Sequence, residues 1–144
     1  MQAGFTTDFE TTEFAGLTTR IMNTDDSPFT VLDMTIKPGF GAPAHISTGE
    51  DKLFMVIEGK LKYLVGTETR IAEAGARIQV PKGVVHGFTN VGAGEARHIL
   101  VSTPRRHEEF FRDLNSLPEP REQHMDMLAE ISARNAQEIV GPLP

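Results

Sequence analysis

The chain has 144 residues, a formal net charge of −6 and no cysteine. This length predicts a single domain that is large enough to bury its own core. The acidic balance argues against a nucleic-acid-binding surface, and the lack of cysteine excludes disulfides and thiolate metal sites.

Short alternating segments occupy the first two thirds of the chain. Residues 1 to 12 are polar and rich in threonine, and we expect a loose arm or an edge strand there. Apolar and polar residues then alternate with the period of two that is typical of strands, over residues 18–22, 29–37, 44–47, 53–57, 60–65, 70–73, 77–80, 86–90 and 97–102. Glycine- and proline-rich turns separate these segments, which predicts an all-β sandwich or small barrel.

The periodicity changes to a helical one after Thr103. Acidic residues followed by apolar residues at positions 110, 111 and 114 predict a first helix over residues 107–114. A second helix is predicted over residues 121–136, and the tail 138–144 is expected to lie extended against the barrel. We therefore divide the chain into an N-terminal arm and first strand (1–24), a β-barrel (25–103) and a C-terminal helical extension with its tail (104–144).

Two histidines lie near the start of two predicted strands, each after a turn that contains proline and glycine. Pro38 and Gly39 precede the strand of His45, which shares a face with Ser47. Pro81 and Gly83 precede His86, which shares a face with Phe88. This arrangement is typical of a site in the mouth of a β-barrel.

These residues resemble two sequence motifs of the cupin family, over about residues 25–103. The second motif is matched at every fixed position, by Gly75, Pro81, Gly83, His86 and Asn90. In the first motif Gly39, His45 and Gly59 match, whereas Ser47 replaces a histidine and Lys52 replaces a glutamate. The resemblance implies a double-stranded β-helix, the jelly-roll cupin barrel, here with a short C-terminal helical extension.

The resemblance also implies where a divalent metal ion would bind in other family members. Carried over by position, the ligand set becomes His45, Ser47, Lys52 and His86. Transition-metal ions usually require three or four protein ligands, one of them often anionic, and an ammonium group in that position repels a cation. We therefore expect no cofactor. The alternative is one nickel, iron, manganese or zinc ion held by His45 and His86, with Glu50 as a third ligand if its hairpin turns inward; otherwise Glu50 is a solvated turn residue.

Lys52 then becomes the residue to explain. It shares a strand face with Phe54, and the family geometry directs that face into the barrel. We predict Lys52 and His86 as catalytic residues, if there is catalysis, and a ligand-binding set of His45, Ser47, Phe54, Tyr63 and Phe88. A lysine that snorkels to solvent and aromatic residues that belong to the core are the structural alternatives.

Three hypotheses on function stay open at this point. The first is a small-molecule-binding cupin with a degenerate metal site, suited to an anionic or phenolic ligand. The second is a metal-dependent, quercetinase-like dioxygenase, and the third is a non-catalytic scaffold or sugar-binding module. If the protein is an enzyme, the resemblance implies dioxygenase or isomerase chemistry.

Its partners are expected to be a small molecule and a second copy of the chain, since the family commonly dimerises. We expect neither nucleic acid nor a membrane as a partner. The N-terminus has neither the basic start nor the apolar core of a signal peptide, and the location is predicted to be cytoplasmic.

Overall fold

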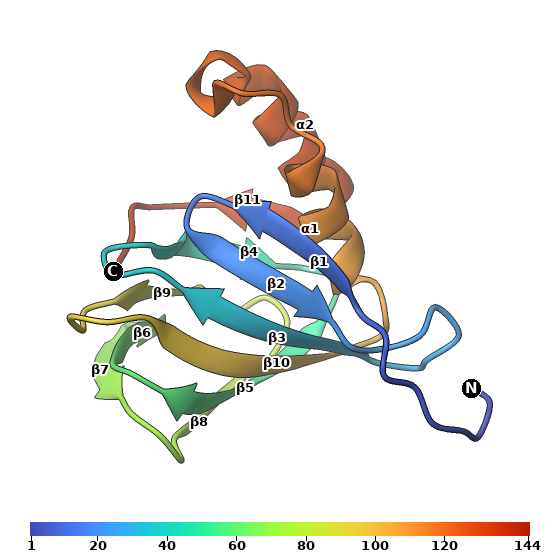
Figure 1. Cartoon of the computed structure of the whole chain (residues 1–144). Coiled ribbons are helices and arrows are strands. Elements are labelled where there is room, and N and C mark those ends of the chain that lie inside the picture. Colours follow the sequence, from blue (N-terminus) through green and yellow to red (C-terminus); the bar gives the residue numbers. More distant parts are fainter.

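Two antiparallel β-sheets face each other, and helices cover one end of the barrel that they form (Figure 1). The computed structural model describes the backbone of residues 1–144 and all side chains except that of Glu122. The first sheet has six strands in the order β1 (Glu10–Phe14), β2 (Leu17–Ile21), β3 (Thr30–Ile36), β10 (Ala96–Thr103), β5 (Asp51–Glu58) and β8 (Arg77–Val80). The second has five, in the order β11 (Gln137–Ile139), β4 (Gly41–Ser47), β9 (His86–Asn90), β6 (Leu61–Val65) and β7 (Glu68–Ala72).

The C-terminal extension contains helices α1 (His107–Asn115) and α2 (Met125–Arg134), with a short 3-10 turn at Arg121–Gln123 between them. The chain then returns as β11, which pairs with β4 at the edge of the second sheet. In Figure 1, α1 lies against the end of the barrel near β1, while α2 leads away from it. None of the described helices is long and apolar enough to cross a membrane.

The core lies between the two sheets and follows from the alternation of the strands. Leu32, Met34 and Ile36 of β3 are at most 1% exposed, whereas Thr35 between them is only half-buried. Leu100 of β10 pairs with Leu32 on one side and with Phe54 of β5 on the other. Because successive residues of a strand point to opposite faces, this register brings the large apolar side chains to one interior.

A local irregularity separates the pairing of β4 with β9 into two parts. The register shifts between Ala42 and His45, and Pro43, which has no N–H to donate to the ladder, lies inside this shift. On the far side of it, His45 pairs directly with His86. At Gly41 a Cβ atom would lie 1.9 Å from the carbonyl oxygen of Phe88, so only glycine permits the close approach of the two strands here.

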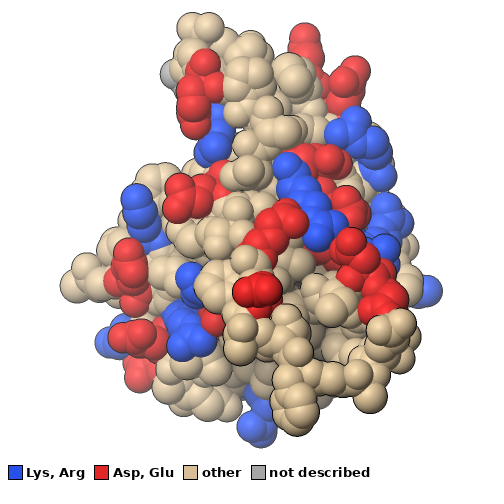
Figure 2. Space-filling model, turned by 45° about the vertical axis from the view of Figure 1, so that its right-hand side comes forward, with Lys and Arg blue, Asp and Glu red and all other residues tan. Residues whose placement is uncertain are grey.

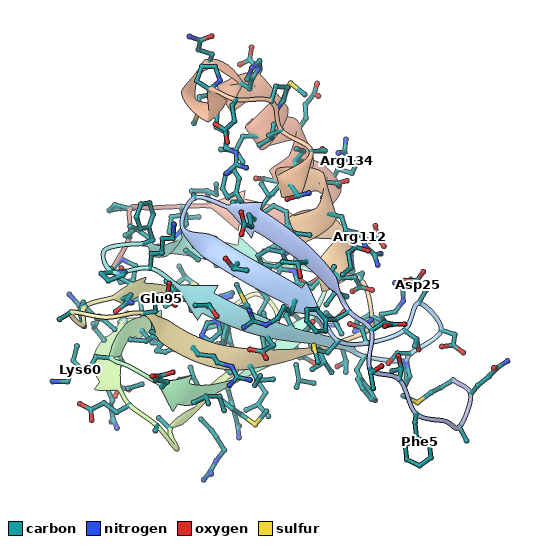
Figure 3. All side chains as sticks on the ribbon, in the orientation of Figure 1. Phe5, Asp25, Lys60, Glu95, Arg112 and Arg134 are labelled. Atoms are coloured by element: carbon teal, nitrogen blue, oxygen red, sulfur yellow. The ribbon has the colours of Figure 1, made fainter. Side chains whose placement is uncertain are left out.

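A group of ion pairs holds the helical extension to the edge of the first sheet. Arg112 of α1 contacts Glu10 of β1 at 3.0 Å and Asp25 of the loop between β2 and β3 at 3.4 Å. Figure 3 shows Arg112 and Asp25 near each other at the junction of helix and barrel. Figure 2 shows basic and acidic side chains interspersed on the visible face, without a continuous patch of either sign.

The fold predicted from the sequence is confirmed, since the chain forms a mostly β barrel of two antiparallel sheets with short C-terminal helices. Each segment predicted as a strand contains one, and β1 and β11 are additional strands at the edges. The second helix is shorter than predicted, because the segment before Met125 forms the separate 3-10 turn. The N-terminal arm forms no strand before Glu10, and its Phe5 points away from the body of the protein (Figure 3).

Candidate functional site

A hydrogen bond between Lys52 and His86 connects the two sheets inside the barrel. Lys52 lies in β5 of the first sheet, His86 opens β9 of the second, and Nζ of the lysine is 3.1 Å from Nε2 of the histidine. The lysine is 5% exposed and the histidine 2%. Among the described residues, His86 is the one hydrogen-bond partner of Nζ, and no carboxylate forms an ion pair with it. A buried amine with a single partner is the central feature of this site.

The turn before β9 fixes the protonation pattern of His86. Gly83 has a φ of +86°, a backbone conformation that glycine adopts without steric strain. Its N–H donates to the carbonyl of Ser47 at 2.9 Å. The backbone carbonyl of Val84 lies 2.9 Å from Nδ1 of His86. A carbonyl can only accept, so Nδ1 carries the proton and Nε2 is the acceptor for Lys52.

The irregularity in β4 has the same effect on His45. The carbonyl of Pro43, inside the register shift, lies 2.6 Å from Nδ1 of His45. Nδ1 therefore holds the proton and Nε2 is an unprotonated acceptor. The rings of His45 and His86 lie side by side, with centroids 4.2 Å apart. The site thus combines two imidazole acceptors with one amine donor.

The charge states follow from burial in this interior. Burial lowers the pKa of Lys52 from 10.5 to about 7, although the carboxylate of Glu50 acts in the opposite direction. Burial, and then the positive charge of Lys52, lower the pKa of His45 to about 3 and that of His86 to about 2. Both histidines are neutral at neutral pH, and the amine of Lys52 exists in both of its protonation states.

A cavity of about 140 Å³ opens beside these groups, between the barrel and the C-terminal extension. His45 and Lys52 form part of its lining, and Phe54 and Phe88 form much of its inner wall. The opposite wall consists of side chains from the extension: His107, Phe110, Phe111, Leu114, Leu128 and Gln137. Apart from the site residues, the lining is therefore mostly aromatic and aliphatic.

Glu50 connects this outer wall to the barrel. Its side chain is 0% exposed, so the prediction of a solvated turn residue is wrong. Oε1 accepts a hydrogen bond from Nε2 of Gln137 at 2.7 Å, and Nδ1 of His107 lies 3.3 Å away. Burial tends to raise the pKa of Glu50, but the contact with His107, the charge of Lys52 and Gln137 stabilise the carboxylate and lower it to about 2.

Two of the predicted ligand-binding residues lie outside the cavity lining. The hydroxyl of Ser47 donates to Oε1 of Gln137 at 2.7 Å. The hydroxyl of Tyr63 is hydrogen-bonded to Nδ1 of His98 at 2.5 Å, deeper in the core. His45, Lys52, Phe54 and Phe88 do line the cavity, and His86 is bound to Lys52.

Sequence reasoning missed the residues of the extension that complete the site. His107 and Gln137 are far from the motifs in the chain, and no local pattern indicates that they contact Glu50. The apolar spacing of Phe110, Phe111 and Leu114 did predict the helix, but not the surface against which Phe111 and Leu114 are buried. Non-local contacts of this kind are set by tertiary packing.

The side chains at the positions that hold a metal ion in related proteins do not fit one here. The N–H of Lys52 occupies the lone pair on Nε2 of His86 that a metal ion would need. Glu50 is engaged by Gln137 and His107, and no group of three or more His, Cys, Asp or Glu side chains suited to a metal occurs among the described residues. The protonated amine of Lys52 would also repel a metal cation. At ~5 Å and an effective dielectric constant of about 20, each pair of like unit charges repels by about 3 kcal/mol.

Comparisons with known proteins agree with the fold. A family model for a cupin domain matches residues 32–102. An RmlC-like cupin from Shewanella frigidimarina is 19% identical, with a TM-score of 0.64 over 73% of this chain and 92% of that chain. KdgF from a Halomonas species is 19% identical, with a TM-score of 0.62 over 71% of this chain and 90% of that chain.

A third structure is similar along the whole chain. Streptomyces PAC13, solved with uridine, is 15% identical, with a TM-score of 0.66 over 100% of this chain and 95% of that chain. No curated protein matches the sequence. At these identities the structural similarities show the shared fold alone.

The lowered pKa of Lys52 predicts a pH-dependent stability. Between about pH 7 and pH 10.5 the unfolded chain binds a proton at this lysine that the folded chain has lost, so the free energy of unfolding rises with pH across that window. Replacing Lys52 by methionine removes this contribution. We expect urea unfolding to show that wild type gains stability relative to Lys52→Met as the pH rises through the window.

The exposed Lys82 provides the matched control, because Lys82→Met leaves the buried amine in place. Its stability should follow that of the wild type at every pH. Parallel curves for wild type and Lys52→Met would show instead that the lysine keeps its ordinary pKa.

Proposed function

This chain is a member of the cupin superfamily, and on that premise we propose that it binds a small single-ring phenol or enol in the barrel cavity. The observation that carries the proposal is the buried amine of Lys52, with His86 as its one hydrogen-bond partner among the described residues. When protonated, this amine has two further N–H groups without acceptors, which is costly in an apolar interior. A ligand oxygen that bears negative charge supplies an acceptor.

The two kinds of polar group around the cavity favour a hydroxyl that is acidic. Lys52 donates, whereas the unprotonated Nε2 of His45 accepts. A phenol or enol satisfies both, because its oxygen accepts from the amine while its proton is offered to the imidazole. Transfer of that proton to the neutral amine of Lys52 leaves a phenolate or enolate in a charge-assisted hydrogen bond with the ammonium group.

The size and the lining of the cavity support a ligand of one ring. Its volume of about 140 Å³ is similar to the ~150 Å³ of an engineered apolar cavity that holds benzene. Pockets for drug-sized molecules usually measure ~300–1,000 Å³. The walls formed by Phe54, Phe88 and Phe111 provide apolar contact to a ring and few partners for the hydroxyls of a sugar.

We expect 4-fluorophenol to bind saturably, as followed by fluorine NMR at neutral pH. Lys52→Met should weaken this binding by about tenfold or more, because hydrogen bonds to charged groups contribute about 1.5–3 kcal/mol. Fluorobenzene, which has the same ring without the hydroxyl, should bind to the wild type more weakly than 4-fluorophenol does. Its affinity should be the same for the wild type and for Lys52→Met.

The control variant is again Lys82→Met, which should bind 4-fluorophenol as the wild type does. Equal affinities of wild type and Lys52→Met for 4-fluorophenol would contradict the proposed role of the amine. Equal affinities of the wild type for 4-fluorophenol and fluorobenzene would contradict recognition of the hydroxyl.

A metal-dependent dioxygenase is the second candidate, because His45 and His86 both present unprotonated Nε2 atoms. The amine at Nε2 of His86 and the small cavity weigh against it, since a flavonol is a drug-sized molecule. We expect elemental analysis of protein purified without a histidine tag or chelator to find far less than one metal ion per chain. About one equivalent of nickel, iron, manganese or zinc would favour the dioxygenase.

A further inference from the structure

The amine of Lys52 is placed as a nucleophile as well as a hydrogen-bond donor. It belongs to the lining of the cavity, and one of its N–H groups is committed to His86. The neutral amine leaves one N–H group without an acceptor among the described residues, whereas the charged form leaves two N–H groups and a buried positive charge. The surroundings therefore favour the neutral form, whose lone pair is available for reaction.

His86 orients this amine. Its Nδ1–H is held by the carbonyl of Val84, so Nε2 can act only as an acceptor toward Nζ. The flexible lysine side chain is thereby fixed at its end, and its remaining valences are directed away from the imidazole. His86 is in this sense a positioning residue for Lys52.

The walls around the amine suit a carbonyl compound of small size. Phe54 lies two residues beyond Lys52 on the same strand face, and its ring packs against Phe88 with centroids 6.0 Å apart. Phe110 and Phe111 of α1 line the opposite side. Because Lys52 is only 5% exposed, little water reaches its amine, which favours the formation of an imine and slows its hydrolysis.

From this geometry we infer that Lys52 forms a covalent imine with a small aldehyde or ketone bound in the cavity. This inference rests on the proposed function, because the carbonyl is the keto tautomer, or an aldehyde-bearing analogue, of the enol or phenol proposed above. It adds a reaction to a site for which binding alone was proposed.

The step is balanced without an added reagent. The lone pair of Nζ attacks the carbonyl carbon while the π electrons of the C=O bond move to its oxygen, which gives a carbinolamine after a proton moves from nitrogen to oxygen. The nitrogen lone pair then forms the C=N bond, the hydroxyl group leaves with a proton as water, and no atom changes its net oxidation state. One amine and one carbonyl give one imine and one water.

Reductive trapping with salicylaldehyde tests the inference, because this probe carries a phenol hydroxyl and an aldehyde on one ring. Wild-type protein is incubated with salicylaldehyde and sodium cyanoborohydride, and the site of the reduced adduct is found by peptide mass spectrometry. The adduct is expected on Lys52 in preference to Lys37, Lys60, Lys62 and Lys82, which are all more exposed. An excess of 4-fluorophenol should protect Lys52 and leave labelling of the other lysines unchanged.

The variant Lys82→Met is the matched control for the imine, because it leaves Lys52 and the cavity lining in place. The adduct on Lys52 should be unchanged in this control, whereas Lys52→Met should lose it and keep the labelling of the other lysines. If Lys52→Met does not fold, as judged by circular dichroism, protection of the wild type by 4-fluorophenol serves as the second measurement.

The outcomes distinguish the two proposals. Adduct spread over the exposed lysines, without enrichment at Lys52, overturns the imine, while 4-fluorophenol binding by the same protein still supports the proposed function. Adduct on Lys52 without binding of 4-fluorophenol supports the imine and overturns the phenol site.

Discussion

The hydrogen bond between Lys52 and His86 is the constraint on which the rest of this site depends. It joins the two sheets at 3.1 Å in an interior that excludes solvent from both side chains. An amine in that position must lose its proton or obtain an acceptor from a ligand, because the protein provides one partner among the described residues. The lysine also takes the lone pair that would bind a metal ion, and it therefore changes the chemistry that the same barrel can support.

The backbone around the two histidines supports this interaction. Pro43 interrupts the pairing of β4, and Pro81 follows the end of β8. The carbonyls of Pro43 and Val84 then hold the Nδ1–H groups of His45 and His86. Both imidazoles consequently point an acceptor nitrogen into the site. The same turns that give the fold its characteristic motif thus determine the tautomers of its polar residues.

The C-terminal extension forms the second wall of the cavity beside the barrel. Gln137 of β11 and His107 of α1 both contact the buried carboxylate of Glu50. Arg112 holds α1 to the edge of the first sheet. Burial lowers the pKa of His107 to about 4, so it contacts Glu50 as a neutral ring at neutral pH. The negative charge of Glu50 is thereby kept near Lys52, where it opposes the effect of burial on the amine.

The strands and turns could be predicted from the sequence, because alternation and turn residues are local signals. The jelly-roll barrel, the inward position of Lys52 and the shared site of His45 and His86 were expected from the resemblance to the cupin motifs. The contacts of Glu50, Ser47 and Tyr63 could not be predicted, because their partners are distant in the chain. Gln137 lies 87 residues from Glu50 and 90 from Ser47, and His98 lies 35 residues from Tyr63. Packing of the extension decides these contacts, and no pattern within one element reports it.

Direct titration of Lys52 by NMR is the measurement that tests this account most directly. Protein labelled with carbon-13 at the lysine Cε atoms would give one signal for each lysine, with that of Lys52 assigned by its loss in Lys52→Met. The account predicts that this signal titrates near pH 7, well apart from those of the exposed lysines. Titration near the ordinary lysine value of about 10.4 would show that the amine stays charged and solvated, and would contradict the account.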